Sequence, residues 1–269
     1  MNTLPGIDPT VFTHHTAQAN GVQLHYVRGG QGPVVLLWHG FLETWYCWRK
    51  IMPVLAKQYT VIAPDMRGYG DSDKPDHGYD VRTLAEDFRT LVQHLGLMGK
   101  IILVAHDMGA PPALLYAAEY SDEVQALVYL DNPVLTAKNI QQIHAFTPEG
   151  TKNGGLWWWD FALATDIPER LLIGKEREFL TWFYQGDTHD QGASIEEVAV
   201  TEYLRTFSGA VGVRVGLGGV LGLGEKVKPM LEGVARHVQG GVVPDCGHFI
   251  PDEQPDYLLR LSEFLIQQA

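Results

Sequence analysis

Cysteine, basic charge and long apolar runs are all scarce in this chain of 269 residues. Two cysteines, Cys47 and Cys246, are too few for a disulfide framework or a structural zinc site. Lys and Arg number 20 against 32 Asp and Glu, and the resulting charge of −12 argues against nucleic acid or an anionic membrane as partner. No apolar run approaches the roughly 20 residues that a membrane-spanning helix needs.

Targeting and cofactor patterns are absent as well. Residues 1–20 lack the basic start and apolar centre of a secretory signal, so we expect a cytoplasmic protein. Residues 216–224 contain five glycines without the GxGxxG spacing of a dinucleotide site. The histidines, His14–His15 included, form no metal-site pattern with carboxylates. We therefore expect no cofactor, no metal and a small-molecule substrate as partner, and the sequence leaves a homodimer open.

Apolar runs and helical patterns alternate over the first half of the chain. Such alternation predicts an α/β fold, a mostly parallel sheet with helices on both faces. We expect a hairpin from about Phe12–Thr16 and Val22–Arg28, then strands at Val34–Trp38, Tyr59–Ala63, Ile101–Val104 and Val124–Leu130. Helices are expected between these strands, with apolar faces that include Trp45 to Leu55 and Leu84 to Leu95.

The alternation breaks after Pro133. Residues 134–212 are helical in pattern and rich in aromatic side chains, which indicates an inserted cap. The core domain is then residues 1–133 and 213–269. Within its second part we expect Val213–Leu217 to return to the sheet and Val238–Val243 to form the last strand, before a C-terminal helix.

The segment Val104–Ala110 joins an expected strand to an expected helix and has Asp107 at its centre. Small residues two before and two after the centre, Ala105 and Gly109, are typical of a nucleophile elbow, a sharp turn between strand and helix. An Asp carboxylate is ionised at neutral pH, and it can attack an electrophilic carbon to form an ester. The simpler interpretation, an Asp that only caps the helix, does not explain the flanking small residues.

Together with this elbow, several motifs resemble one known family, the α/β-hydrolases, in which nucleophile, acid and histidine follow in that order. The resemblance covers nearly the whole chain. It is most specific for epoxide hydrolases and haloacetate dehalogenases with an Asp nucleophile, and for Cif-type epoxide hydrolases in particular. The matching segments are His39-Gly40-Phe41, Thr44-Trp45-Tyr46, Val104-Ala105-His106-Asp107, Leu127-Val128-Tyr129-Leu130-Asp131, Gly174-Lys175-Glu176-Arg177 and Cys246-Gly247-His248.

The resemblance implies a role for each matching residue. His248 would be the general base that activates water against the ester. Asp131 matches the acid position of the resembled subgroup, whereas Glu225 is the only carboxylate near the more common position after the next strand. The backbone amides of Phe41 and Met108 would form the oxyanion hole.

The leaving group is where the sequence departs from the family. Epoxide opening needs a proton donor, and in the resembled family this is a cap His with a cap Tyr. The His position falls on the Trp157–Trp159 run, and the Tyr-bearing stretch has no counterpart in this short cap. An indole N–H can hold a halide but is no acid at neutral pH. Candidates for substrate contact in the cap are Trp157, Trp158, His144 and Tyr184, with Tyr203 as a further replacement acid.

Met108 and Pro111 stand where haloacetate dehalogenases carry arginines, which favours an uncharged substrate. We therefore predict an epoxide hydrolase, with a dehalogenase as the alternative. A catalytically silent ligand-binding protein of the same fold is the second alternative, because fold alone does not establish activity.

Overall fold

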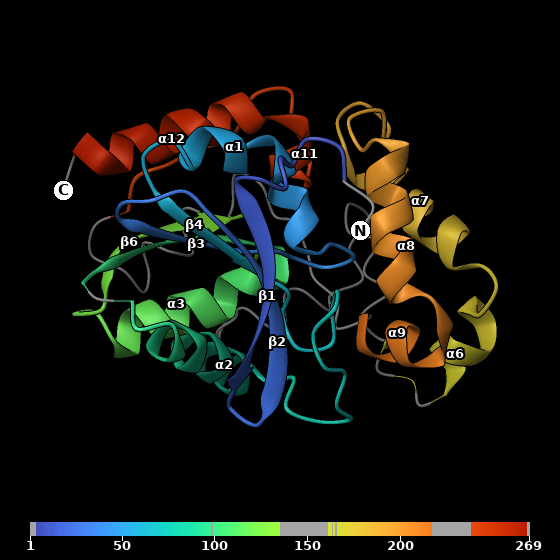
Figure 1. The fold of residues 1–269 in the computed structure, drawn as a ribbon. Helices are drawn as coiled ribbons and strands as arrows, with labels where there is room; N and C mark the ends of the chain where they lie inside the picture. The colour runs from blue at the N-terminus through green and yellow to red at the C-terminus, as the bar shows by residue number, and fades with distance from the viewer. Residues whose placement is uncertain are drawn as a thin grey trace.

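A twisted sheet forms the centre of the computed structural model, with helices on both of its faces (Figure 1). The structure describes residues 4–97, 99–134, 161–162, 164, 166–216 and 238–267. Four residues singled out from the sequence, His144, Trp157, Trp158 and Glu225, lie outside these ranges.

The sheet has six strands in the described part, in the order β1-β2-β4-β3-β5-β6. Strands β4, β3, β5 and β6 are parallel, and β1 and β2 form an antiparallel hairpin that joins β4 through β2. Asn20 and Gly21 connect the hairpin, and both have the positive φ that such two-residue turns require. The strands are β1 (Phe12–Ala19), β2 (Val22–Gly29), β3 (Val34–Trp38), β4 (Thr60–Pro64), β5 (Ile101–His106) and β6 (Val124–Leu130).

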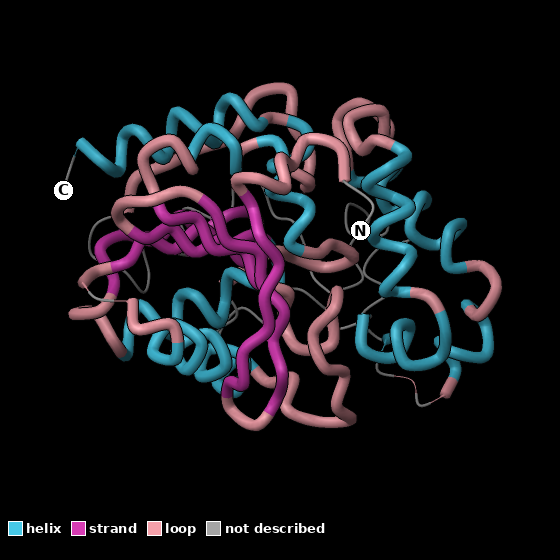
Figure 2. The backbone as a smooth tube through the Cα atoms, viewed as in Figure 1, coloured by secondary structure: helices cyan, strands magenta, loops and turns pink. Residues whose placement is uncertain are grey.

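Helices cover both faces of the sheet, and strands β3, β4 and β5 are therefore buried along their whole length. In Figures 1 and 2, α2 and α3 lie on one side of the sheet, and α1 and α12 on the other. Trp38 at the end of β3 stacks on Phe88 of α2, with ring centroids 3.7 Å apart. The elements are a 3₁₀ turn η1 (Trp45–Lys50), α1 (Met52–Leu55), α2 (Val81–His94), α3 (Ala110–Glu119), α11 (Ile250–Glu253) and α12 (Pro255–Gln267).

Four further helices stand together beside the sheet (Figure 1). They are α6 (Ile167–Leu172), α7 (Glu176–Asp187), α8 (Glu197–Phe207) and α9 (Gly209–Gly216). Phe183 of α7 meets Phe41 edge to face at 5.4 Å, and Tyr184 meets Phe249 in the same way at 5.1 Å. These aromatic contacts join α7 to the turn after β3 and to the start of α11. The predicted cap boundaries at 134 and 212 stay a prediction.

Two sequence predictions about the sheet are wrong. Residues 213–216 of the expected strand Val213–Leu217 belong to helix α9, because a short apolar run does not distinguish a buried strand from a buried helix. Residues 238–243 carry no regular secondary structure. The Gly240–Gly241 pair makes ordering costly there, and Val242 is 58 % exposed rather than packed in the sheet.

The cysteines and the length of the helices agree with what the sequence predicts. Cys47 and Cys246 are both free thiols, the first buried and the second partly buried. None of the helices within the described ranges combines the length and hydrophobicity needed to cross a membrane.

Candidate active site

Strand β5 ends in a sharp turn, and Asp107 occupies its first position, in the turn η2 (Asp107–Gly109). Its backbone is left-handed, with φ +48°, and its side chain is buried. Small neighbours allow this turn. A Cβ on Gly109 would come within 2.6 Å of the His39 carbonyl, and one on Gly40 within 2.4 Å of Cβ of Asp107. The glycines therefore let the backbone of His39 and Gly40, in the turn after β3, lie close to Asp107 and its turn.

Both carboxylate oxygens of Asp107 accept hydrogen bonds. The Phe41 amide donates to Oδ2 at 2.8 Å, and the Asn132 side-chain amide donates to Oδ1 at 3.2 Å. Phe41 thus lies where an oxyanion donor must lie relative to the nucleophile. Met108 follows Asp107 in the turn, and its Sδ accepts a hydrogen bond from the Tyr69 hydroxyl at 3.3 Å. A role for the Met108 amide stays a prediction.

His248 lies between two aspartates. Its Nε2 is 3.5 Å from Oδ2 of Asp107, and its Nδ1 is 2.8 Å from Oδ2 of Asp131. Asp131 follows the last residue of β6 and is also left-handed, with φ +40°. Burial lowers the pKa of His248, but the charge of Asp107 and hydrogen bonds with both aspartates together hold that pKa well above its usual value. The structure brings together the three residues predicted from the sequence as a triad.

The turn that carries His248 is clamped by Glu253 of α11. The Glu253 carboxylate accepts hydrogen bonds from the amides of Gly247 at 2.9 Å, Phe249 at 3.0 Å and His189 at 2.7 Å. His189 lies just after helix α7, so one carboxylate joins the turn that carries His248 to the end of α7. A Cβ on Gly247 would lie 2.2 Å from the carbonyl oxygen of Asp187, which leaves room only for glycine.

A buried ion pair between His106 and Glu43 lies next to the elbow. His106, the residue before the nucleophile, has Nδ1 2.9 Å from Oε2 of Glu43 and Nε2 2.7 Å from the carbonyl oxygen of His248. Both partners are acceptors, so both ring nitrogens carry protons and the ring is an imidazolium. Burial lowers the pKa of His106, but the charge of Glu43, the hydrogen bond with Glu43 and the charge of Asp107 together raise that pKa above its usual value. Glu43 also accepts a hydrogen bond from the Gly40 amide at 3.1 Å, which fixes the turn after β3.

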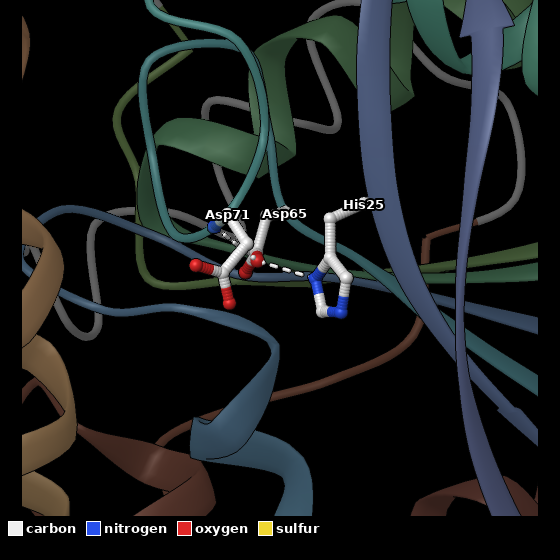
Figure 3. A group of neighbouring side chains, drawn as sticks. All are labelled: His25, Asp65 and Asp71. Carbon is white, nitrogen blue, oxygen red and sulfur yellow. Dashed lines mark hydrogen bonds and ion pairs between the residues drawn. The ribbon is translucent and has the colours of Figure 1, made fainter. Parts of the chain in front are cut away.

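A second polar group joins His25 of strand β2 to Asp65 and Asp71 in the turn after β4 (Figure 3). His25 Nδ1 is 2.7 Å from Oδ2 of Asp65, and the same oxygen accepts from the Asp71 amide at 3.0 Å. The Asp71 carboxylate pairs with the Arg205 guanidinium through two bonds of 2.7 Å. These atoms are engaged in contacts within the protein, and through Arg205 they join the turn after β4 to helix α8.

The two cap tyrosines considered from the sequence are both buried. The Tyr184 hydroxyl donates to the Leu42 carbonyl at 2.9 Å, and burial raises the pKa of this hydroxyl well above its usual value. Tyr203 lines a small cavity between α8 and the turn after β3. Its hydroxyl and Oε1 of Glu43, which lines the same cavity, have no partner among the described atoms.

The chain is similar in sequence and in fold to known proteins. A family model for the α/β-hydrolase fold matches residues 33–171, more than half of the chain. The chain belongs to the α/β-hydrolase fold family. The order Asp107, Asp131, His248 is the family's order of nucleophile, acid and histidine, and the sheet and its helices confirm the predicted fold class.

Within this α/β-hydrolase family, two kinds of relative stand out. The soluble epoxide hydrolase of Corynebacterium sp. (strain C12) is 34 % identical and aligns over 93 % of this chain and 96 % of its own. The structure of the epoxide hydrolase CorEH without ligand is 30 % identical, covers 96 % of this chain and 99 % of its own, and superposes with a TM-score of 0.84. The fluoroacetate dehalogenase of Burkholderia sp. is 33 % identical over 68 % of this chain and 59 % of its own.

Some residues at the site carried no signal in the sequence. Asn132 follows the predicted acid directly, yet nothing in its spacing indicated that its amide reaches Asp107. Glu43 and His106 are 63 positions apart and meet only because the turns after β3 and β5 are neighbours. His106 lies inside a segment that resembles the family, and Glu43 lies directly before another such segment. Only this resemblance indicates from the sequence that the two residues belong to the site.

Proposed function

We propose that this protein is an epoxide hydrolase that converts an uncharged epoxide to a vicinal diol through an ester on Asp107. The observation that carries the proposal is the surroundings of the Asp107 carboxylate. The carboxylate lies on a turn with left-handed backbone and accepts a hydrogen bond from the Phe41 amide, and its Oδ2 is 3.5 Å from Nε2 of His248. Similarity to epoxide hydrolases over almost the whole chain supports the same reaction.

The proposed reaction has two steps. First, an Asp107 oxygen attacks an epoxide carbon, the carbon–oxygen bond of the ring breaks, and the ring oxygen takes up a proton. Second, His248 removes a proton from a water molecule, which attacks the carbonyl carbon of the ester. Asp131 holds the imidazole in the orientation that this step needs. The Phe41 amide then stabilises the oxyanion, and collapse of the intermediate releases the diol.

Trapping the ester tests the proposal. His248→Ala should form the ester and fail to hydrolyse it, so its intact mass should rise by the mass of one epoxide. The double variant Asp107→Ala/His248→Ala is the matched control and should gain no mass. A panel of terminal and aryl epoxides that leaves His248→Ala unmodified, and wild-type protein that forms no diol from them, would contradict the proposal.

A dehalogenase is the second candidate, because the fluoroacetate dehalogenase relative matches two thirds of the chain. Met108 and Pro111 follow the nucleophile here, and neither can pair with the carboxylate of a haloacid. Assays for free halide with a haloalkane and with fluoroacetate separate the two functions. Halide release without any diol formation from epoxides would favour the dehalogenase, and neither product would favour a silent ligand-binding protein.

We also propose a cytoplasmic location and a small-molecule substrate as the principal partner. The support is the pair of free thiols, which a reducing compartment maintains, and the acidic net charge of −12, which disfavours nucleic acid. Fractionation of the native host with a thiol-alkylation assay on Cys246 tests the location.

A further inference from the structure

The two carboxylate oxygens of Asp107 have different hydrogen-bond donors. Oδ2 accepts a hydrogen bond from the Phe41 backbone amide at 2.8 Å and lies 3.5 Å from Nε2 of His248. Oδ1 accepts a hydrogen bond from the side-chain amide of Asn132 at 3.2 Å. A carboxylate only accepts, so the nitrogen of the Asn132 amide must face it. The nucleophile thus has a backbone donor at one oxygen and a side-chain donor at the other.

The turn after β6 brings Asn132 to the nucleophile. Strands β5 and β6 are parallel neighbours in which His106 is opposite Leu130, so Asp107 and Asp131 both follow the last paired residues. The backbone of Asp131 is left-handed, with φ +40°, and the side chain that follows it, Asn132, is 4 % exposed and reaches Asp107. One turn therefore supplies the acid that orients the histidine and, at the next position, a donor to the nucleophile.

The Phe41 amide indicates which oxygen of Asp107 attacks the substrate. It is a backbone donor held by the turn after β3, and negative charge must develop beside such a donor when water attacks the ester. The oxygen next to Phe41, which is Oδ2, is then the carbonyl oxygen of the ester. The attacking oxygen is therefore Oδ1, the one that accepts from Asn132.

We propose that Asn132 is a catalytic residue of the second step, in which its amide stabilises Oδ1 of Asp107 as the ester breaks. The inference rests on the proposed epoxide hydrolase activity. Oδ1 is the bridging oxygen of the ester and leaves with the product. Negative charge grows on it as its bond to Cγ breaks, and a donor already in place forms a stronger hydrogen bond as that charge grows.

The atoms and electrons of this step balance. Water gives one proton to Nε2 of neutral His248 and forms a bond to Cγ of Asp107, and a carbonyl electron pair moves onto Oδ2. That pair then re-forms the carbonyl, the bond from Cγ to Oδ1 breaks, and its electrons stay on Oδ1. The proton of the added hydroxyl goes to Oδ1, which leaves as a hydroxyl of the diol. Asp107 is again a carboxylate, with one oxygen from water, and His248 is an imidazolium.

The same hydrogen bond acts in the opposite sense in the first step. The Asn132 amide stabilises the charge on Oδ1 of the free carboxylate, and that charge disappears as Oδ1 attacks carbon. An interaction that is stronger in the ground state than in the transition state does not accelerate a step. A residue that only orients the carboxylate would instead assist the attack. The two roles therefore predict opposite effects on alkylation.

Asn132→Leu removes the donor with little change in volume and tests the inference with 1,2-epoxyhexane. Alkylation, measured in the His248→Ala background where the adduct accumulates, should be no slower when Asn132→Leu is added. Ester decay, measured by rapid-quench mass spectrometry in Asn132→Leu alone, should be slower than in wild type by about 10²-fold, as for loss of one donor to a developing oxyanion. Asn20→Gly removes an amide that donates to the Asp87 carboxylate and should change neither rate.

A less basic departing oxygen gives a second measurement. Whichever of its carbons is attacked, trifluoromethyloxirane forms an ester that releases a less basic alkoxide than 1,2-epoxyhexane does. This alkoxide needs its donor less, so the loss of ester decay in Asn132→Leu should shrink to under about 10-fold. An equal loss with both epoxides contradicts the inference, because a residue that only maintains the shape of the site does not sense the basicity of the leaving oxygen.

The ratio of the two rates separates the inference from the proposed function. If Asn132→Leu slows ester decay no more than it slows alkylation, the inference is overturned, and the ester on Asp107 and the epoxide hydrolase function remain. If His248→Ala forms no adduct with either epoxide, the proposed function and the inference fail together.

A crystal structure of alkylated His248→Ala protein covers the case in which Asn132→Leu does not fold. The alkyl carbon should be bonded to the oxygen of Asp107 that faces the Asn132 amide, with that amide still within hydrogen-bond distance. The Phe41 amide should still donate to the other oxygen. An alkyl carbon on the oxygen next to Phe41 contradicts the inference.

Discussion

Nδ1 of His248 lies 2.8 Å from Oδ2 of Asp131, which joins two residues 117 positions apart in the chain. With Nδ1 donating to this carboxylate, Nε2 faces Asp107 and the space where water must stand to reach its ester. The bond therefore selects which ring nitrogen is the base.

Asp131→Asn should leave ester formation nearly intact and slow its hydrolysis. An Asn at this position does not stabilise the imidazolium that forms when His248 accepts a proton, and a loss of about 10³–10⁴ in kcat is typical of such a change. Rapid-quench mass spectrometry should then find the adduct in the variant at steady state. Asp122→Asn, at an exposed loop position, serves as the control. An unchanged kcat would point to a different acid, and Glu225→Gln is the variant to test next.

The pH dependence of the second step should differ from the titration of the resting enzyme. Burial opposes protonation of His248, but the Asp107 charge is the largest influence that raises its pKa, which lies well above the usual value in the free protein. Ester formation removes that charge, so the pKa of His248 falls just when a neutral base is needed. Ester decay should therefore rise with pH through a lower pKa than the one that NMR measures for His248 in the resting enzyme. Coincident values would show that Asp107 does not control this histidine.

Removal of either partner of the Glu43–His106 pair should cost different amounts of stability. His106→Leu leaves a buried carboxylate without its counter-charge, and such changes cost about 3–5 kcal/mol. Glu43→Gln can present an amide N–H to Nδ1, so the ring can become neutral while Nε2 still donates to the His248 carbonyl, and its cost should be smaller. Urea unfolding at neutral pH measures both.

The same pair has a defined pH signature. Burial raises the pKa of Glu43, but the charge of His106 and the hydrogen bonds from His106 and the Gly40 amide together lower this pKa by more, so that it lies below its usual value. The stabilisation by Glu43 is therefore complete above its unfolded pKa and is lost as pH falls through its folded pKa. The stability gap between wild type and Glu43→Gln should close in acid. A gap that widens in acid would contradict the ion pair.

Gly247→Ala should damage the site far more than a matched glycine substitution nearby. A Cβ at 247 would stand 2.2 Å from the Asp187 carbonyl, and that contact cannot relax without moving the His248 turn or the end of α7. We expect a loss of stability of about 1–3 kcal/mol and a kcat/KM at least about 10-fold lower. Gly241→Ala has open space around its new methyl group and should change neither quantity. Thermal unfolding and diol formation measure the two effects.

Much of the first half of the fold was predictable from the sequence, for a physical reason. A strand buried on both faces is a nearly continuous apolar run, and Val34–Trp38, which is buried along its whole length, has the predicted bounds. Val124–Leu130 also has the predicted bounds, although most of its residues are only partly buried. The elbow was recognisable because its geometry requires small residues at fixed offsets from Asp107. The proximity of Asp131 and His248 followed from the family resemblance rather than from local pattern.

The remaining elements depend on contacts that no local pattern records. Residues 213–216 are helical although their apolar character suits a strand equally well. The ion pair of Glu43 with His106 and the approach of Asp187 to His248 both join segments that are distant in the chain. Their partners are chosen by the packing of turns at the strand ends, which a single sequence does not specify.

The left-handed backbone at Asp107 and at Asp131 has a consequence for engineering. Each non-glycine residue held at such φ values costs on the order of 1–3 kcal/mol, and the two stand at the ends of the neighbouring strands β5 and β6. A domain's total stability is only about 5–15 kcal/mol. Selection for thermostability alone would therefore favour glycine at both positions and produce a tougher protein without a nucleophile. Improved variants of this enzyme should gain their robustness elsewhere in the molecule.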